Sequence, residues 1–406
     1  MNRSTGLHSA ARHPDLQGRS ILQLIPSLDA GGAERTTLDV AAGLAMVGAR
    51  ALVASAGGRL VAELHANGGE WTRFPANTKN PLQLMANIGR LKRLCRDEGV
   101  ALIHARSRAP AWSALAAARS LRIPFVTTYH GIYGGRTAPK LLYNSVMCRG
   151  DVVIANSRYT AETIGRLFPW ASGRVVVIHR GTDLSIFQPS SVAPERVAQI
   201  RSSWGVAPGE RIVLLAARLT GWKGQKVFIE AARRLVCDGL QDVTFVMAGD
   251  PQGRDNYVRD LDSLIAAHDL VGRVKRVGHC TDMPAAFLAA AAVAVPSTEP
   301  EAFGRSAVEA QALGTPVIVT DLGAVPETVL APPDVPDGER TGWRIPSSDP
   351  QALADGISAA ISLQQGQLTA MQARARAHVE AHFSLEGMVD ATLGVYESLV
   401  QAKART

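Results

Sequence analysis

The sequence of 406 residues contains no stretch of 18 or more consecutive apolar residues, so it predicts no membrane-spanning helix. The first twenty residues carry several charges and no apolar segment of the length that a secretory signal needs. We therefore expect a disordered tail over residues 1–19. Cysteine is also scarce, because only four are present and none forms a C-x-x-C pair. This usage is typical of reduced thiols in a cytoplasmic protein rather than of disulfides or a zinc site.

Two phosphate-binding patterns are missing from the chain. It contains no G-x-G, so it lacks the dinucleotide fingerprint of nicotinamide and flavin enzymes, and it contains no Walker A string. Aromatic residues make up only 5% of the chain, and no stretch interleaves them with basic residues. A stacking platform for nucleic acid needs that combination. We therefore expect no nucleic-acid partner.

The excess of positive over negative side chains lies in the first half of the chain. The formal net charge is +7, but residues 1–185 carry a balance of +12 and residues 186–406 a balance of −5. A basic domain attracts an anionic membrane surface or an acidic substrate. The sequence therefore predicts that the first half faces such a partner.

Short apolar runs alternate with helical patterns through both halves, which predicts parallel sheets covered by helices on both faces. A linker rich in Ser and Pro separates the halves at Phe187–Pro194. The expected fold class is α/β, with two doubly wound Rossmann-like domains that face a cleft. We place them at residues 20–187 and 188–383, with a final helix at 384–406. The expected strands are Ile21–Ile25, Ala51–Ala54, Leu102–His104, Phe125–Thr128, Val152–Ile154, Val175–Ile178, Ile212–Ala216, Thr244–Ala248, Val274–Val277, Ala292–Val295 and Val317–Thr320.

The segment around Gly304 is the most informative part of the chain. An apolar run ends before Ser297, and a helical pattern starts near Ala307. Free N–H groups at a helix N-terminus bind phosphate. The carboxylates of Glu301 and Glu309 flank that position, and carboxylates accept hydrogen bonds from hydroxyls. Phosphate and hydroxyl recognition together suit a sugar nucleotide.

Upstream, an apolar strand ends at Ala216 and is followed by Arg218 and Lys223 in a Gly-flanked turn. Arginine offers a bidentate fork and lysine a point charge, the two usual ways to hold a diphosphate. In the first half, Gly31 and Gly32 lie between a strand and a helix, where the missing side chains allow a ligand to approach the backbone. Taken without context, each of these groups is also compatible with ordinary surface charges or an ordinary turn.

Together these motifs resemble the retaining glycosyltransferases of family 4, which have the GT-B fold, over about Ile21 to Val400. The similar segments are Gly31–Arg35, Tyr129–Gly131, Asn156–Ser157 and Gly181–Phe187, and the donor-site positions match Arg218, Lys223, Glu301 and Glu309. The chain departs from the family pattern at Arg180, where Asn is usual, and at Gly323–Ala324, where Gly-Gly is common.

The resemblance implies a nucleoside diphosphate sugar as donor and roles for individual residues. His130, Arg218, Lys223 and Glu301 are the expected catalytic residues. Arg218 and Lys223 neutralise the diphosphate, Glu309 holds the ribose, and Glu301 holds the transferred sugar. Gly31, Gly32, Phe303 and Gly304 complete the donor site through backbone contacts, and the final helix crosses back to the first domain.

The acceptor is predicted from two weaker signals. Arg106 and Arg108 follow a strand end, and the segments Arg106–Trp112 and Gly278–Pro284 resemble bacterial lipopolysaccharide core mannosyltransferases. We therefore expect GDP-mannose as the donor and a glycan or glycolipid acceptor, with the protein held peripherally on the anionic inner face of the membrane. A nucleotide-sugar epimerase on the same fold and a non-catalytic nucleotide-sugar-binding subunit are the alternatives.

No metal or other cofactor is expected. Asp260 and Asp262 spell the D-x-D that binds metal in other glycosyltransferases, but they lie within a helical stretch at Asp255–Ala267. A cationic clamp already supplies the charge that a metal would bring to the diphosphate.

Overall fold

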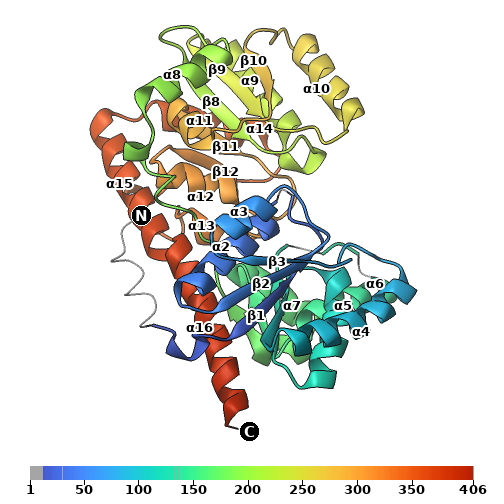
Figure 1. Ribbon diagram of the computed structural model, residues 1–406. Helices are drawn as coiled ribbons and strands as arrows, with labels where there is room; N and C mark the ends of the chain where they lie inside the picture. The colour runs from blue at the N-terminus through green and yellow to red at the C-terminus, as the bar shows by residue number, and fades with distance from the viewer. Residues whose placement is uncertain (1–11, 30, 132, 136, 406) are drawn as a thin grey trace. The chain divides into compact units, whose positions relative to one another are not determined.

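A computed structural model of the chain describes residues 12–29, 31–131, 133–135, 137–405. The fold divides into two compact units (Figure 1). Unit 1 comprises residues 1–181 and 385–406, and unit 2 comprises residues 182–384. Within the described ranges, no helix is both long enough and apolar enough to cross a membrane.

Unit 1 is built on a parallel sheet of seven strands in the order β3-β2-β1-β4-β5-β6-β7. The chain runs outward from β1 on one side and then returns to continue from β4 on the other. The order therefore reverses between β1 and β4. The strands are β1 (Ser20–Leu24), β2 (Arg50–Ser55), β3 (Glu70–Arg73), β4 (Val100–Ala105), β5 (Phe125–Tyr129), β6 (Val152–Ala155) and β7 (Val175–Val177).

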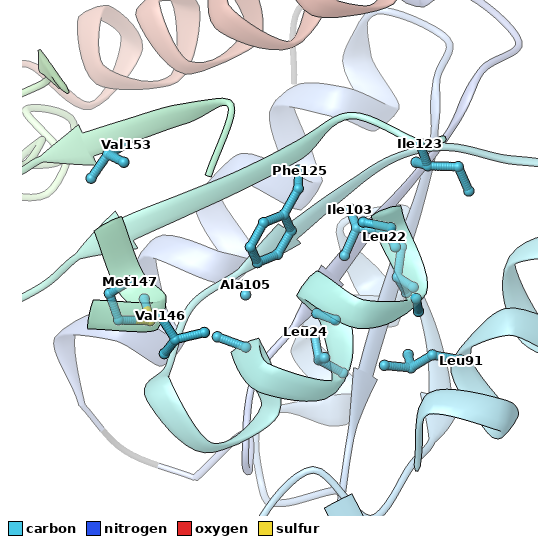
Figure 2. Packing of buried hydrophobic residues seen from close by; sticks show 14 of the residues in the cluster. Leu22, Leu24, Leu91, Ile103, Ala105, Ile123, Phe125, Val146, Met147 and Val153 are labelled. Carbon is cyan, nitrogen blue, oxygen red and sulfur yellow. The ribbon is translucent and has the colours of Figure 1, made fainter. Parts of the chain in front are cut away.

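Helices cover both faces of this sheet, because alternate strand side chains point to opposite sides. Leu22 and Leu24 of β1 pack with Phe125 of β5 against one helical layer, as Figure 2 shows. Ile21 packs on the other face. The first layer contains α4 (Pro81–Asp97), α5 (Arg108–Leu121), η2 (Ser145–Cys148), α7 (Arg158–Leu167) and η3 (Pro169–Arg174), with α6 (Ala138–Asn144) beside η2. The second contains α2 (Gly32–Met46), α3 (Val61–Ala66) and α16 (Leu385–Ala404).

The C-terminal helix α16 belongs to the core of unit 1. Its Tyr396 is fully buried, and the helix packs against α2, β4 and the short helix η1 (Pro14–Leu16). Leu16 of η1 is also fully buried. The expected return of the final helix to the first domain is confirmed. The expected disordered tail is wrong for residues 12–19, because an apolar side chain there fills the groove beside α16. Residues 1–11 of that tail lie outside the described residues.

Unit 2 has a parallel sheet of six strands in the order β10-β9-β8-β11-β12-β13, which reverses between β8 and β11. Two apolar clusters cover its faces. The strands are β8 (Arg211–Ala216), β9 (Val243–Ala248), β10 (Val274–Gly278), β11 (Ala292–Val295), β12 (Val317–Thr320) and β13 (Trp343–Ile345). The helices are η4 (Pro189–Ser191), α8 (Pro194–Ser203), η5 (Gly221–Lys223), α9 (Gln225–Cys237), α10 (Asp255–Ala267), α11 (Met283–Ala289), α12 (Arg305–Ala312), α13 (Val325–Thr328), η6 (Asp337–Glu339), α14 (Pro350–Ile361) and α15 (Gln365–His382).

Two doubly wound α/β domains are thus confirmed, and most expected elements are present. The sequence did not predict the edge strands β3 and β13, because an edge strand is only partly covered and needs no continuous apolar run. The expected strand Ala292–Val295 is confirmed, although the apolar run that contains it starts at Ala289, which is the last residue of α11. A short alanine-rich run has no periodicity that separates helix from strand.

Candidate functional site

The two loops that carry the predicted donor residues meet where the strand order of unit 2 reverses. In doubly wound sheets, ligands bind at the carboxyl ends of the strands next to such a reversal. Lys223 lies in η5, which follows β8, and Glu301 lies in the loop after the neighbouring strand β11. The sheet topology therefore brings together two residues that are 78 positions apart in the chain.

Backbone contacts fix these two loops against each other. The amide of Thr298 donates to the carbonyl of Trp222 over 2.8 Å. Gly224 adopts a left-handed φ of 76°, and a side chain there would overlap the backbone carbonyl of Pro296. Glycine is therefore required for the two loops to approach this closely.

Lys223 and Glu301 form an ion pair, with 2.5 Å between Nζ and Oε1. Only 15% of the lysine side chain and 10% of the glutamate side chain are exposed. The hydroxyl of Ser297 donates to the same carboxylate oxygen over 2.6 Å. This largely shielded ammonium and carboxylate offer one donor and one acceptor at the edge of the sheet.

The helix N-terminus predicted after Gly304 is present. Gly304 is the N-cap of α12, with a φ of 89°, and Glu309 lies one turn into the helix. The guanidinium of Arg305 donates to Glu309 Oε1 through Nη2 at 2.6 Å and Nε at 3.1 Å. The carboxylate of Glu309 is 10% exposed, whereas the Arg305 side chain is 50% exposed. The carboxylate that is expected to accept hydrogen bonds from ribose is therefore already paired with the half-exposed side chain of Arg305.

Phe303 and Arg218 contribute in different ways. The ring of Phe303 is buried and packs edge-on against Phe383, with 5.6 Å between ring centroids, so only its backbone is available to a ligand. Arg218 follows β8 with an exposed side chain, and its carbonyl accepts a hydrogen bond from Gln225. An open groove of about 710 Å³ borders the η5 turn and is lined by Thr220, Gly221, Trp222, Gly253, Arg254, Asp255, Asn256, Tyr257 and Arg259.

In unit 1, the glycine pair lies at the start of α2. Gly31 is its N-cap and Gly32 its first residue. A side chain at Gly31 would overlap the Glu34 carboxylate, and one at Gly32 would overlap the guanidinium of Arg180. The space in front of this helix end is thus taken by Arg180, the residue at which the chain departs from the family pattern.

His130 follows β5, as expected. Its carbonyl accepts hydrogen bonds from Asn156 Nδ2 at 3.3 Å and from Arg180 Nη2 at 3.4 Å. Both ring nitrogens are shielded from solvent, and neither has a hydrogen-bond partner among the described residues. Burial, together with the nearby charges of Arg180 and Arg106, lowers the pKa of His130 well below its ordinary value. The imidazole is therefore neutral at physiological pH.

The two predicted acceptor arginines lie in different environments. Arg106 is 3% exposed and donates to Gln23 Oε1 through Nη2 at 2.5 Å and Nε at 3.0 Å. Arg108 is the first residue of α5 and does not lie in a loop. Its Nη1 donates to Asn144 Oδ1 over 2.7 Å, and its Cζ lies 4.2 Å from the centroid of the Tyr133 ring. The sequence treats these arginines as a pair, but one belongs to the interior of unit 1 and the other to the contact between α5 and α6.

The D-x-D carboxylates lie on α10 and face cations. Asp262 forms two 2.6 Å hydrogen bonds with Arg276, and Asp260 lies 3.5 Å from the ammonium of Lys226. Over the part of the chain that the structure describes, no three His, Cys, Asp or Glu side chains form a group suited to a metal ion.

Comparison with known proteins identifies the family. The sequence-family model of glycosyltransferase family 4 matches residues 30–186, and the sequence-family model of group 1 glycosyl transferases matches residues 197–378. A crystal structure of a glycosyltransferase from Rickettsia africae is 31% identical to this chain and has a TM-score of 0.86. That alignment covers 94% of this chain and 99% of the other. The chain belongs to glycosyltransferase family 4.

Other relatives of this family 4 chain carry more specific names. HepE from Anabaena, solved with UDP-glucose, is 27% identical, with a TM-score of 0.77 over 93% of this chain and 99% of the other. The D-inositol 3-phosphate glycosyltransferase of Mycobacterium tuberculosis is 32% identical over 260 residues, or 63% of this chain. The chain spans about half the length of the curated relatives that it matches, since the alignment covers 50% of the mycobacterial protein.

Sequence reasoning missed several residues that bond to the predicted ones. Ser297 and Arg305 lie inside the segment used to identify the site, but neither residue type indicates a role there. Arg180 was noted only as a departure from the family pattern. Gln23 gave no signal, because a single glutamine within an apolar strand is unremarkable until its partner is known.

Proposed function

We propose that this protein transfers a glycosyl unit from a nucleoside diphosphate sugar to an acceptor hydroxyl, with retention at the anomeric carbon. The observation that carries the proposal is the Lys223–Glu301 pair at the strand reversal of unit 2, beside the N-terminus of α12. A cation, a hydroxyl acceptor and a helix N-terminus at one sheet edge match the parts of a sugar nucleotide.

Charge stabilisation of the leaving group is the main catalytic contribution in this proposal. Negative charge builds on the diphosphate as the glycosidic bond breaks, and preorganised donors in a shielded site stabilise it more than water does. The ammonium of Lys223, the guanidinium of Arg218 and the start of α12 supply those donors. The leaving phosphate then takes the proton of the acceptor hydroxyl, which attacks from the same face.

The two glutamates bind hydroxyls in this scheme. Glu301 accepts from the transferred sugar while it stays paired with Lys223, so the sugar and the diphosphate are held by one connected group. Glu309 accepts from the ribose while Arg305 is bonded to its Oε1, since a carboxylate has further acceptor positions. Within unit 1, the neutral imidazole of His130 suits a hydrogen bond to a sugar hydroxyl.

The donor and acceptor are finer proposals. GDP-mannose and an acceptor in the lipopolysaccharide core or another cell-envelope glycan follow from the sequence resemblance. UDP-glucose is the second candidate donor, because HepE was solved with it. A nucleotide-sugar epimerase and a non-catalytic binding subunit stay as alternatives.

We also propose that α4 holds the protein at an anionic membrane surface. Its C-terminal half carries what we call the α4 basic patch, which consists of Arg90, Lys92, Arg93 and Arg96. On the N-terminal half, the apolar side chains of Leu82 and Met85 are 76% and 68% exposed. Basic residues near an anionic surface contribute about 1 kcal/mol each, and exposed apolar side chains on the same helix add a contact with the acyl chains.

A panel of nucleotide sugars tests the catalytic proposal. The intact protein is incubated with each donor, with and without glycan acceptors, and the products are separated. Release of nucleoside diphosphate with one donor, accelerated by an acceptor that gains the sugar in retained configuration, is expected. Conversion of the donor into a second sugar nucleotide would establish the epimerase instead. Donor binding without turnover under any of these conditions would favour the non-catalytic subunit.

A further inference from the structure

Unit 1 contains a small polar cavity at its own strand reversal. The cavity has a volume of about 20 Å³ and is lined by Thr36, Arg106, Thr128, His130, Ile154, Asn156, Ile178, Arg180, Met388 and Thr392. Arg106 follows β4 at the reversal between β1 and β4, and His130 follows β5. All ten residues belong to unit 1. We call this cavity the Arg106 pocket.

Arg106 places a buried positive charge in this pocket, and the groups that accept its hydrogen bonds carry no negative charge. Its guanidinium donates to the amide oxygen of Gln23 and to the hydroxyl of Tyr396, which are both uncharged. Among the described residues, no carboxylate accepts a hydrogen bond from Arg106. A buried cation is costly unless an anion accompanies it. Burial accordingly lowers the pKa of Arg106, while the charge of Asp39 opposes that shift.

His130 supplies a second, independent sign of a missing partner. Both of its ring nitrogens are shielded, yet neither bonds to a described residue. Buried polar atoms of this kind are normally satisfied by protein, water or ligand. His130 lines the same cavity as Arg106, so two groups without adequate partners converge on one space.

Three further titratable groups lie near Arg106 and His130, namely His104, Asp39 and Arg180. His104 is buried and bonded to Tyr396 and Thr128, and its pKa lies well below the ordinary value because of burial and then Arg106. It is therefore neutral. The charge of Asp39 acts on Arg106, whereas those of Arg180 and Arg106 act on His130.

We propose that the Arg106 pocket is an anion-binding site that takes one oxygen of a phosphoryl or carboxylate group. A volume of about 20 Å³ admits a single water-sized group, so one oxygen enters and the rest of the anion stays at the mouth. Of the lining residues, Arg180 and His130 are partly exposed, whereas Thr128 and Asn156 are buried. The anion receives hydrogen bonds from Arg106 and Arg180 and one from the imidazole N–H of His130.

The anion has two possible sources, the diphosphate of the donor and an anionic group on the acceptor. The identity of the anion rests on the proposed function, since His130 and Arg106 are among its expected catalytic and acceptor residues, but no residue of the pocket belongs to the Lys223 clamp.

The test monitors the His130 ring directly. The protein is labelled with ¹⁵N-histidine, the His130 ring resonances are assigned with His130→Gln, and inorganic phosphate is titrated in. Saturable movement of the His130 resonances is expected. Arg180→Asn should weaken phosphate binding about tenfold or more, the order expected for one charged hydrogen bond. Arg180→Lys, which keeps the charge, should bind between the two.

Two further variants separate this site from the rest of the molecule. Arg174→Asn removes an exposed arginine of unit 1 that does not line the pocket, and it should leave the phosphate titration unchanged. Lys223→Ala should also leave it unchanged while weakening binding of a nucleoside diphosphate. If Lys223→Ala binds the nucleoside diphosphate as tightly as the wild type does, while phosphate still shifts the His130 resonances, the proposed function is rejected and the Arg106 pocket is retained as an anion site.

Competition identifies the source of the anion. Displacement of phosphate from the His130 signal by a nucleoside diphosphate indicates the donor diphosphate, and simultaneous binding of both indicates an acceptor group. The proposal is overturned if added phosphate does not shift the His130 resonances, or if Arg180→Asn responds to phosphate as the wild type does.

Discussion

Replacing Lys223 with alanine gives the most direct test of the diphosphate clamp. The change removes an ammonium whose side chain is only 15% exposed, at a position where charge counts for more than it does in water. Loss of one preorganised donor to a developing anion costs about 2.7 kcal/mol, or roughly 100-fold in kcat/KM. We expect at least that loss with the preferred nucleotide sugar, and a similar loss for Arg218→Ala.

The same change also affects stability, and the two effects must be separated. Without Lys223, the hydroxyl of Ser297 is the one hydrogen-bond donor that the shielded carboxylate of Glu301 keeps among the described residues of unit 2. We expect unit 2 to lose about 1–3 kcal/mol in its free energy of unfolding. The double variant Lys223→Ala, Glu301→Gln removes the uncompensated charge, so it should recover most of that stability and none of the activity.

Lys226→Ala is the matched control. It removes the same charge three residues away, where the ammonium faces Asp260 and both side chains are more than half exposed. Exposed pairs of this kind contribute about 1 kcal/mol or less, so activity and melting temperature should stay near the wild-type values. Initial rates are measured well below the melting temperature of each variant. Near-wild-type kcat/KM for both Lys223→Ala and Arg218→Ala would refute the clamp.

Four other predictions follow from the structure. Turnover should survive EDTA, because the carboxylates of the D-x-D are already opposite cations; complete loss that Mn²⁺ or Mg²⁺ restores would reverse this expectation. In calorimetry with a free nucleoside diphosphate, Glu309→Gln should weaken binding more than Glu301→Gln, and the opposite order would exchange their roles. Liposome flotation should require anionic lipid, decrease with salt over a Debye length of about 8 Å, and weaken when the α4 basic patch is changed to serine; equal recovery on neutral vesicles would remove the membrane proposal. Finally, His104 and His130 are neutral in the folded state and take up protons on unfolding below about pH 6.5, so each should reduce stability by up to about 1.4 kcal/mol per pH unit on acidification. His104→Asn should flatten that dependence in denaturant titrations, and an unchanged slope would contradict the assignment.

The fold was predictable because buried parallel strands leave a strong trace in sequence. Strands such as β8 and β12 are covered on both faces and read as continuous apolar runs. The edge strand β3 is Glu-Trp-Thr-Arg and has no such trace. The segment around Leu16 was also unpredictable, because one apolar residue in a polar stretch gains meaning only when α16 returns beside it.

The site was predictable only in part. The loop and helix that carry Glu301 and Glu309 have recognisable glycines and carboxylates, so their position after β11 could be expected. Which residues bond to each other depends on strand order, which local patterns do not encode. The bond from Arg106 to Gln23 joins the end of β4 to β1 across 83 positions, so the sequence grouped Arg106 with Arg108 as an acceptor residue and gave no sign that its side chain is buried.

The position of α16 also determines the order in which the protein is able to fold during synthesis. Residues 182–384 form unit 2 without any later segment, whereas unit 1 needs residues 385–406 to complete its core. Until Tyr396 leaves the ribosome, the apolar faces of α2 and β4 and the polar side chain of His104 lack their cover. Unit 2 is therefore the first part of the nascent chain that is able to finish folding. A chain that ends before α16 therefore contains every segment of unit 2 but an incomplete core in unit 1.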